Sequence, residues 1–264
     1  MSDSLRDKVV IVTGASSVLG RSITLESTSR GATVILIARR RERLLEIADE
    51  AKRLSGAQAF VITADISKAD QIDAAFKEII QKVDHIDFLV NAAGFGVFEP
   101  FMEMDPQLTT EMFQTNVLGL MYFTRLIARV MMDQNQGQVI NIGSMAGIIP
   151  TTKTAVYSAT KAAVIQFSNV LRLELKPFNV KVMTVNPGPV YTNFFNIADH
   201  SGKYLDNVKR FVMDPDDVAW QIVHFFGTNR RELNLPLSLA FLGKLYQIFP
   251  SLGDWASLKF GSRK

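Results

Sequence analysis

The chain has 264 residues, 47% of them hydrophobic and 21% charged, which is enough apolar material for a large core and too little charge for a disordered chain. Its net charge of +3 comes from 29 basic and 26 acidic residues that are mostly interleaved, so nucleic-acid binding is not expected. The lack of cysteine excludes disulfides, thiolate catalysis and Cys-ligated metals, and three scattered histidines argue against a metal enzyme.

Residues 1–8 are polar and lack the apolar stretch of a signal peptide. No uninterrupted run approaches the about 20 apolar residues that a membrane span requires. The nearest run, residues 233–249, is broken by Asn234, Pro236, Lys244 and Gln247. We therefore expect a cytoplasmic protein.

Six short runs rich in Val and Ile are predicted as strands. Their near-continuous apolar character is typical of parallel strands that helices cover on both faces. They are Lys8–Thr13, Thr33–Ala38, Ala59–Thr63, Phe88–Asn91, Gln138–Ile142 and Lys181–Asn186.

Helical patterns lie between the strands. Asp105 is the predicted N-cap of a helix that begins at Pro106 and runs to about Gln134, and another helix is expected from about Thr154 to Lys176. Repeated strand-then-helix units predict an α/β fold, a single Rossmann-like domain with a doubly wound parallel sheet of about seven strands. Further helices are predicted at Leu19–Arg30, Arg40–Leu54 and Ile72–Val83.

The first strand leads directly into a turn of small residues and then into a helix. A strand–turn–helix at this place is typical of a site for a dinucleotide pyrophosphate, because backbone N–H groups at the helix N-terminus face the phosphates and glycine allows a close approach. The residues predicted to bind the cofactor here are Gly14, Ser16, Ser17, Val18 and Leu19.

The tip of the second strand indicates which dinucleotide binds. A carboxylate there would bind the ribose hydroxyls of NAD and repel a 2′-phosphate, but Ala38 stands there, followed by Arg39 and Arg40. Because guanidinium groups suit phosphate oxygens, we predict NADP(H), with Arg39 as the main contact and Arg40 as a helper. The alternative is a solvated helix start.

Tyr157 and Lys161 are four residues apart and share a helix face. A free phenol has a pKa of about 10, and a nearby ammonium group favours its ionised form, so Tyr157 could exchange a proton with a carbonyl or alcohol oxygen. Ser144 follows the fifth strand, where its hydroxyl can bind the substrate oxygen. Asn116 lies within the long predicted helix, where asparagine is unfavourable, although it could be a surface residue.

Over about residues 8–192, the sequence resembles the short-chain dehydrogenase/reductase family, because these motifs follow one another in the order that the family shows. The usual family motif after the first strand is Thr-Gly-x-x-x-Gly-x-Gly, and this chain departs from it with Val18 at the middle glycine. A β-branched residue there would crowd the pyrophosphate or disfavour a positive φ.

The resemblance implies further roles. Asp65, with Ile66, would contact the adenine, although Asp65 could equally be a helix N-cap. Asn116 would bend its helix and hold a water that connects Lys161 to solvent, while Lys161 would also hold the nicotinamide ribose. Asn91 would tether the sheet. The other implied cofactor contacts are Asn91, Ala92 and Ala93 at the adenosine ribose and Pro187, Gly188, Val190 and Thr192 at the nicotinamide.

The resemblance also implies a substrate lid at about residues 191–212. Together with Ser144 and Tyr157, the apolar residues Phe95, Met145 and Phe194 are predicted to line a pocket for a hydrophobic carbonyl or alcohol. We therefore expect an NADP-dependent oxidoreductase, and we expect a homodimer or homotetramer.

Residues 233–264 form an apolar extension flanked by basic residues. A subunit contact or a pocket cover is preferred to an interfacial membrane helix. Two alternatives to an enzyme remain open. One is a catalytically silent dinucleotide sensor, suggested by Val18, and the other is a membrane-surface protein that uses this extension.

Overall fold

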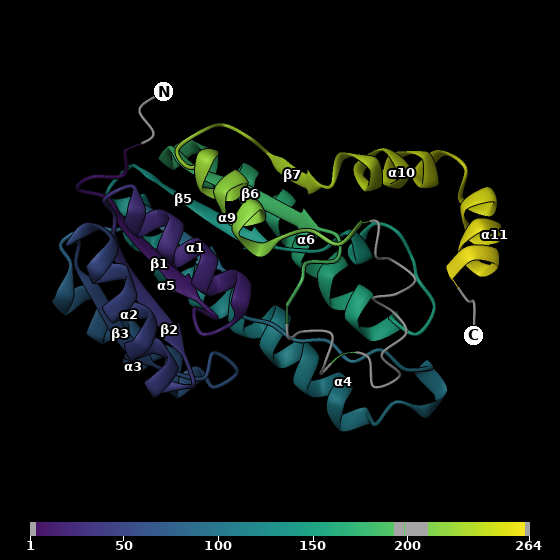
Figure 1. Cartoon of the computed structure of the whole chain (residues 1–264), viewed down its shortest axis with the longest axis horizontal. Coiled ribbons are helices and arrows are strands. Elements are labelled where there is room, and N and C mark those ends of the chain that lie inside the picture. Colours follow the sequence, from purple (N-terminus) through teal and green to yellow (C-terminus); the bar gives the residue numbers. More distant parts are fainter. Residues whose placement is uncertain (1–3, 193–197, 199–210, 262–264) are drawn as a thin grey trace.

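Parallel strands form the centre of the molecule, in the order β3-β2-β1-β4-β5-β6-β7 (Figure 1). The computed structural model describes residues 4–192, 198 and 211–261, and the sheet within them has seven strands. The predicted doubly wound sheet is confirmed, and the six predicted strands agree within one residue at each end. The strands are β1 (Val9–Thr13), β2 (Thr33–Ala38), β3 (Ala59–Thr63), β4 (Phe88–Asn91), β5 (Gly137–Ile142), β6 (Val180–Pro187) and β7 (Glu232–Leu235).

Alternate side chains of the strands pack against helices on opposite faces of the sheet. On one face Val10 and Val12 of β1 join a core with Ile23 of α1 (Val18–Ser29), Leu44 of α2 (Arg41–Ser55) and Ile222 of α9 (Pro215–His224). On the other face Ile11 belongs to the layer formed by α3 (Ala69–Lys82), α5 (Leu120–Asp133) and α6 (Ala155–Leu175). The near-continuous apolar strands are explained by this double covering.

The helix predicted from Pro106 to about Gln134 is interrupted. α4 (Pro106–Phe113) begins as predicted, with the Asp105 carboxylate accepting a hydrogen bond from the Gln107 N–H at 2.8 Å. A π-helical turn, Gln114–Gly119, then precedes α5. A Cβ at Gly119 would collide with the Ile66 carbonyl, so this turn needs glycine where it crosses the loop after β3.

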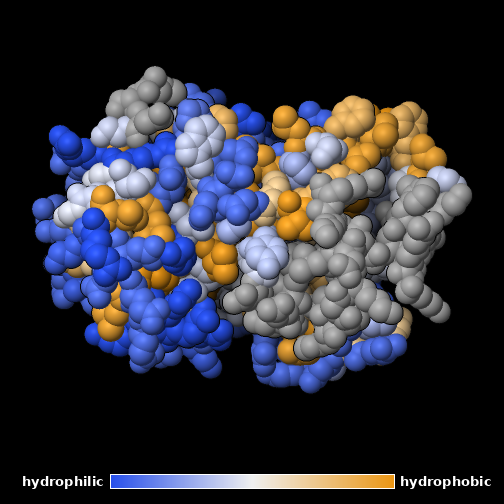
Figure 2. Space-filling view, in the orientation of Figure 1, coloured by the Kyte–Doolittle hydropathy of each residue, from blue (hydrophilic) through white to orange (hydrophobic). Residues whose placement is uncertain are grey.

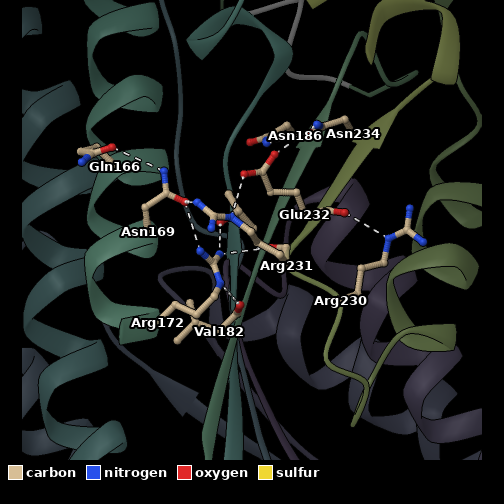
Figure 3. A network of polar contacts seen from close by, with 10 residues as sticks. Gln166, Asn169, Arg172, Val182, Asn186, Arg230, Arg231, Glu232 and Asn234 are labelled. Carbon is tan, nitrogen blue, oxygen red and sulfur yellow. Dashed lines mark hydrogen bonds and ion pairs between the residues drawn. The ribbon is translucent and has the colours of Figure 1, made fainter. Parts of the chain in front are cut away.

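β7 is absent from the predicted strands because its four residues alternate between polar and apolar and are recognisable only by their pairing with β6. Its Leu233 and Leu235, from the predicted apolar extension, are buried in the core. Polar contacts join β7 and the preceding residue to β6 and α6 (Figure 3). Arg172 donates to the carbonyls of Val182 and Arg231 at 2.8 and 3.1 Å, and Asn186 Nδ2 donates to Asn234 Oδ1 at 2.7 Å.

After β7, two helices lie at the end of the molecule opposite α2 and α3 (Figure 1). They are α10 (Leu237–Ile248) and α11 (Pro250–Gly261). The Tyr246 hydroxyl donates to the Asp254 carboxylate at 3.1 Å and joins the two helices. Within the ranges that the structure describes, none of the helices combines the length and apolarity needed to cross a membrane.

Candidate active site

The predicted site residues gather at the carboxyl ends of the central strands. Thr13 at the end of β1 lies beside Asn91 at the end of β4, and Asn91 lies beside Asn141 of β5. This is the edge where open α/β sheets bind ligands, on either side of the point where the strand order reverses.

The small-residue turn after β1 has the backbone that a phosphate-binding turn requires. Gly14 has a φ of +68°, and a Cβ there would lie 2.7 Å from the Ala93 Cα. Glycine is therefore required both by the left-handed conformation and by the close approach of two segments of the chain. Ser17 is the N-cap of α1, and its hydroxyl accepts from the Gly20 N–H at 3.1 Å. The turn therefore ends directly at a helix N-terminus.

Val18 does not strain this turn. It is the first residue of α1 and is not among the described non-glycine residues with a positive φ. The predicted conflict with a positive φ is therefore wrong, because the residue has helical backbone geometry in which valine is allowed. Steric crowding of a pyrophosphate by the valine side chain stays a prediction.

The tips of β2 and β3 bring Arg39 and Asp65 together. One Arg39 guanidinium nitrogen lies 4.0 Å from an Asp65 carboxylate oxygen, and the Arg39 side chain is 78% exposed. Arg40 instead donates to the Ser16 carbonyl oxygen at 2.6 Å and to the Ser16 hydroxyl oxygen at 3.1 Å. Both arginines are exposed, but Arg40 is hydrogen-bonded to the small-residue turn, whereas Arg39 is paired with Asp65 across the strand tips.

Asp65 is not a helix N-cap. α3 begins at Ala69, and its N-cap position is Lys68. One Asp65 carboxylate oxygen instead accepts from the backbone N–H and the hydroxyl of Ser67, at 2.9 and 2.8 Å. The local turn thus ends before the helix starts, and Ile66 within it is buried against Gly119 of the π-helical turn.

Asn91 ties the sheet as the resemblance implied. Its amide nitrogen donates to Thr124 Oγ1 at 2.8 Å and to Asn141 Oδ1 at 2.9 Å. Asn141 in turn donates to Ser168 at 2.9 Å, so a buried polar chain links α5, β4, β5 and α6. Sequence reasoning missed Thr124, Asn141 and Ser168, although an asparagine within the apolar run of β5 was the available signal.

Tyr157 and Lys161 occupy adjacent turns of α6, as predicted. Both are buried, and Lys161 Nζ lies 5.7 Å from the centre of the Tyr157 ring. Lys161 donates to the carbonyl of Ile142, at the end of β5, at 2.9 Å. Burial lowers the pKa of Lys161 from its usual 10.5 to about 8, because removal from water disfavours the charged form.

Asn116 is buried in the π-helical turn, which excludes the surface alternative. Its amide group accepts from the Phe95 N–H at 3.0 Å and donates to the Phe95 carbonyl at 2.8 Å. It also donates to Thr160 Oγ1 at 3.1 Å, and Thr160 donates to the Tyr157 carbonyl at 2.7 Å. Asn116 thereby fixes the loop after β4 against the turn of α6 that carries Tyr157.

Ser144 lies at the end of β5 and begins a short 3₁₀ turn, Met145–Gly147. Its hydroxyl accepts from the Ala146 N–H at 3.1 Å. A Cβ at Gly147 would lie 2.9 Å from backbone atoms of Lys161 and Ala162, so the segment that carries Ser144 packs directly on α6 at Lys161. The four predicted catalytic residues are thus brought to one corner, which we call the catalytic corner and which consists of Asn116, Ser144, Tyr157 and Lys161.

Gly94 lies beside the catalytic corner, and no separate role was predicted for it from the sequence. A Cβ there would lie 2.9 Å from Asn116 Oδ1 and 3.7 Å from Lys161 Nζ. Glycine therefore allows the backbone to pass close to the Asn116 side chain, near Lys161.

The segment after β6 is fixed from two sides. The Gly188 N–H donates to the Leu235 carbonyl at 2.7 Å, and the Tyr191 N–H donates to the Met213 carbonyl at 2.9 Å. Pro187 ends β6, Val190 pairs with Met213, and Thr192 is half-buried beyond it. These residues hold the position predicted for nicotinamide binding, at the same sheet edge as Ser144.

The predicted substrate residues are partly described. Phe95 packs with the cluster that contains Tyr157, and Met145 is buried beside Gly243 of α10. Phe194 and most of the predicted lid lie outside the described residues. A separate hollow of about 490 Å³ between α9, β7 and α10 is lined by none of the predicted site residues. The active site is therefore inferred from the positions of the predicted side chains.

Most of the chain is similar to known proteins. Residues 8–201 match the family model described as short chain dehydrogenase. An uncharacterized oxidoreductase of Staphylococcus epidermidis is 34% identical over 188 residues, which cover 71% of this chain and 80% of that protein. An NADP-dependent 3-hydroxy acid dehydrogenase of Schizosaccharomyces pombe is 31% identical over 242 residues, which cover 90% and 93%.

A solved structure gives a similar result. An alcohol dehydrogenase from the archaeon Thermococcus sibiricus, in complex with 5-hydroxy-NADP, has a TM-score of 0.77 at 25% identity. The similarity covers 86% of this chain and 95% of that one.

Proposed function

The chain belongs to the short-chain dehydrogenase/reductase family, and on that premise we propose that it transfers a hydride between NADP(H) and the carbonyl or alcohol carbon of a hydrophobic small molecule. The observation that carries the proposal is the buried Tyr157–Lys161 pair, with the Ser144 segment and Asn116 packed around it.

Tyr157 is the proposed acid and base. In the reducing direction its hydroxyl gives a proton to the carbonyl oxygen while the carbon receives a hydride, and in the oxidising direction both transfers reverse. A Lys161 ammonium in the neighbouring turn favours the phenolate form of Tyr157. The pKa of about 8 for Lys161 leaves it mostly protonated at pH 7.

Ser144 and Asn116 have different proposed roles. The Ser144 hydroxyl binds the substrate oxygen and stabilises the negative charge that develops on it. Asn116 is a positioning residue, because its side chain is engaged with Phe95 and Thr160 and acts on Tyr157 through them.

The described residues fit a dinucleotide. At Gly14 and Gly94 the backbone passes other segments too closely for a Cβ, and α1 begins directly after the turn that contains Gly14. When bound, the nicotinamide would supply or accept the hydride. We assign the pyrophosphate to this turn, the adenine to Asp65 and Ile66, the adenosine ribose to residues 91–93 and the nicotinamide to residues 187–192.

The preference for NADP(H) over NAD(H) rests on Arg39. Its guanidinium is 78% exposed at the tip of β2, where Ala38 stands at the position of a ribose-binding carboxylate, and its ion-pair partner Asp65 lies 4.0 Å away at the tip of β3. The preference for a hydrophobic substrate rests on the apolar surroundings of Tyr157, which include Phe95, Phe98 and Val97.

The test is an activity screen with NADPH and a panel of ketones of increasing chain length. Turnover is measured as the loss of nicotinamide absorbance. The proposal expects turnover of apolar ketones that the Tyr157→Phe variant lacks. If the folded wild type binds neither NADPH nor NADH at millimolar concentration, the proposal fails.

A further inference from the structure

The two C-terminal helices present an apolar surface to solvent. Along α10, Leu237, Phe241 and Ile248 are spaced four and seven residues apart, so they lie on one side of the helix. Their side chains are 76%, 67% and 68% exposed. Figure 2 shows the hydrophobic colour gathered at this end of the molecule. We call this surface the apolar arm, and its exposed residues are Leu237, Phe241, Leu242, Leu245, Ile248, Phe249, Leu252 and Trp255.

The opposite side of α10 explains why the arm faces outward. A Cβ at Gly243 would lie 3.0 Å from Ile148 and 3.2 Å from Met145, so α10 lies against the segment that follows Ser144. Leu239 packs on Gly188. The inner side of α10 therefore packs on the segment after Ser144, and a stripe of large apolar residues is left on the outer side.

The net charge of the chain comes from the C-terminal part of the sequence. Residues 233–264 contain four of the 29 basic residues, Lys244, Lys259, Arg263 and Lys264, and only one of the 26 acidic residues, Asp254. Residues 1–232 therefore carry 25 residues of each sign, and the whole net charge of +3 belongs to the C-terminal segment.

An apolar surface of Leu, Phe and Trp on a segment of net positive charge is complementary to the surface of an anionic bilayer, where the apolar face enters the headgroup region and cations meet acidic lipids. α10 has 12 residues, fewer than the about 20 that a span requires, so it can lie on a membrane but not cross it. A second copy fits less well, because a two-fold contact of the arm with itself would bring two segments of charge +3 together.

We propose that the apolar arm docks the protein on the surface of an anionic lipid bilayer. The inner side of the same helix borders Met145, so docking places the substrate end of the site beside the lipid. The docking itself does not depend on the proposed catalytic function, and it is measured without an enzyme assay.

The experiment is co-sedimentation of the full chain with vesicles of phosphatidylcholine alone or with 30% phosphatidylglycerol. We expect at least tenfold more protein bound to the anionic vesicles and at least a tenfold loss of that binding in Phe241→Gln/Ile248→Gln. The charge variant Lys244→Gln/Lys259→Gln should lose binding and its dependence on salt. A matched control is Leu54→Gln/Ile80→Gln, which removes exposed apolar residues of α2 and α3 and should bind like the wild type.

Circular dichroism and thermal melting establish that each variant is folded. The proposal is overturned if the folded wild type does not sediment with anionic vesicles, or if the arm and control variants lose binding equally. It is also overturned if the wild type stays in the supernatant while light scattering shows that Phe241→Gln/Ile248→Gln converts a dimer into a monomer. That result would assign the arm to a second copy.

Discussion

The catalytic corner and the apolar arm reverse the usual distribution of side chains in opposite ways. In the corner, groups that favour water are buried, and Lys161 is only 7% exposed. In the arm, side chains that favour the core face solvent, with Phe241 67% exposed. Each arrangement costs free energy in the isolated folded chain, through desolvation of a charge in one case and hydration of apolar surface in the other.

The two regions differ in how they can be recognised from the amino-acid sequence. Proton exchange needs a phenol and an ammonium at fixed spacing, so the corner is visible as a motif that names its residues. A surface for lipid needs only apolar area and charge of the right sign, so the arm is visible as composition alone. Conflicts with folding preference are expected at functional sites, and variants that remove each conflict separately test this interpretation.

The largest effect is expected at Tyr157. The Tyr157→Phe variant removes the hydroxyl and keeps the buried ring against Phe98, so kcat with the best ketone should fall about 10²- to 10⁴-fold. NADPH affinity and the melting temperature should change little. Tyr122→Phe, at an exposed tyrosine of α5, is the control and should keep full activity. Retained activity in Tyr157→Phe would show that the reaction does not depend on the Tyr157 hydroxyl, so that the burial of the catalytic corner would lack its proposed chemical reason.

Lys161 tests the cost of the corner directly. Because burial lowers its pKa from 10.5 to about 8, the unfolded chain binds more protons between these values, and wild-type stability should rise with pH across that window. Below pH 8 the full penalty is present, about 3 kcal/mol from a shift of that size. Lys161→Met should lack the rise, and it should be about 1–3 kcal/mol more stable at pH 7 although inactive, after loss of its hydrogen bond to Ile142.

The measurement is urea denaturation at pH 7, 9 and 10.5. Lys77→Met, at an exposed lysine of α3, serves as the matched control and should keep the wild-type pH profile. Parallel pH profiles for wild type and Lys161→Met would show that Lys161 is not the group whose burial destabilises the fold.

The fold was predictable where the sequence repeats one physical signal. β1 to β6 are continuous apolar runs because helices cover both faces, and they were located within a residue. β7 could not be found, because its alternating Glu-Leu-Asn-Leu becomes a strand only by pairing with β6. The π-helical turn was also out of reach, since Asn116 and Gly119 weaken a helix without specifying how the chain crosses Ile66.

The candidate site shows the same division. The types and spacing of Ser144, Tyr157 and Lys161 indicated chemistry, and the structure brings their segments together. The partners of each group depend on chains distant in sequence. Arg40 donates a hydrogen bond to the Ser16 carbonyl. The Asp65 carboxylate accepts from Ser67, whereas a helix N-cap was one of its two predicted roles. Local patterns name candidates, whereas tertiary contacts decide which atoms remain available.

A smaller effect is expected at the cofactor end. Arg39→Ala should raise the NADPH dissociation constant about 10- to 100-fold, which corresponds to loss of about 1.5–3 kcal/mol from hydrogen bonds to a charged group. NADH affinity should stay within about twofold because NADH lacks the 2′-phosphate, and the control Arg41→Ala should leave both unchanged. Nicotinamide fluorescence titration measures each constant. Equal losses for NADPH and NADH would assign Arg39 to a part of the dinucleotide that both share.

The smallest effect is expected for the arm in the absence of lipid. Phe241→Gln/Ile248→Gln should change the free energy of unfolding by less than about 0.5 kcal/mol, because both side chains are mostly exposed and leave no cavity. Phe123→Ala, at a fully buried phenylalanine of α5, should cost about 3–5 kcal/mol in the same urea titration. A loss above about 2 kcal/mol for the arm variant that grows with protein concentration would mean that the face is covered by a second copy, because only association makes stability depend on concentration. An unchanged stability at every concentration would leave the arm as surface that the folded chain itself does not use, which is the property a lipid-docking surface requires.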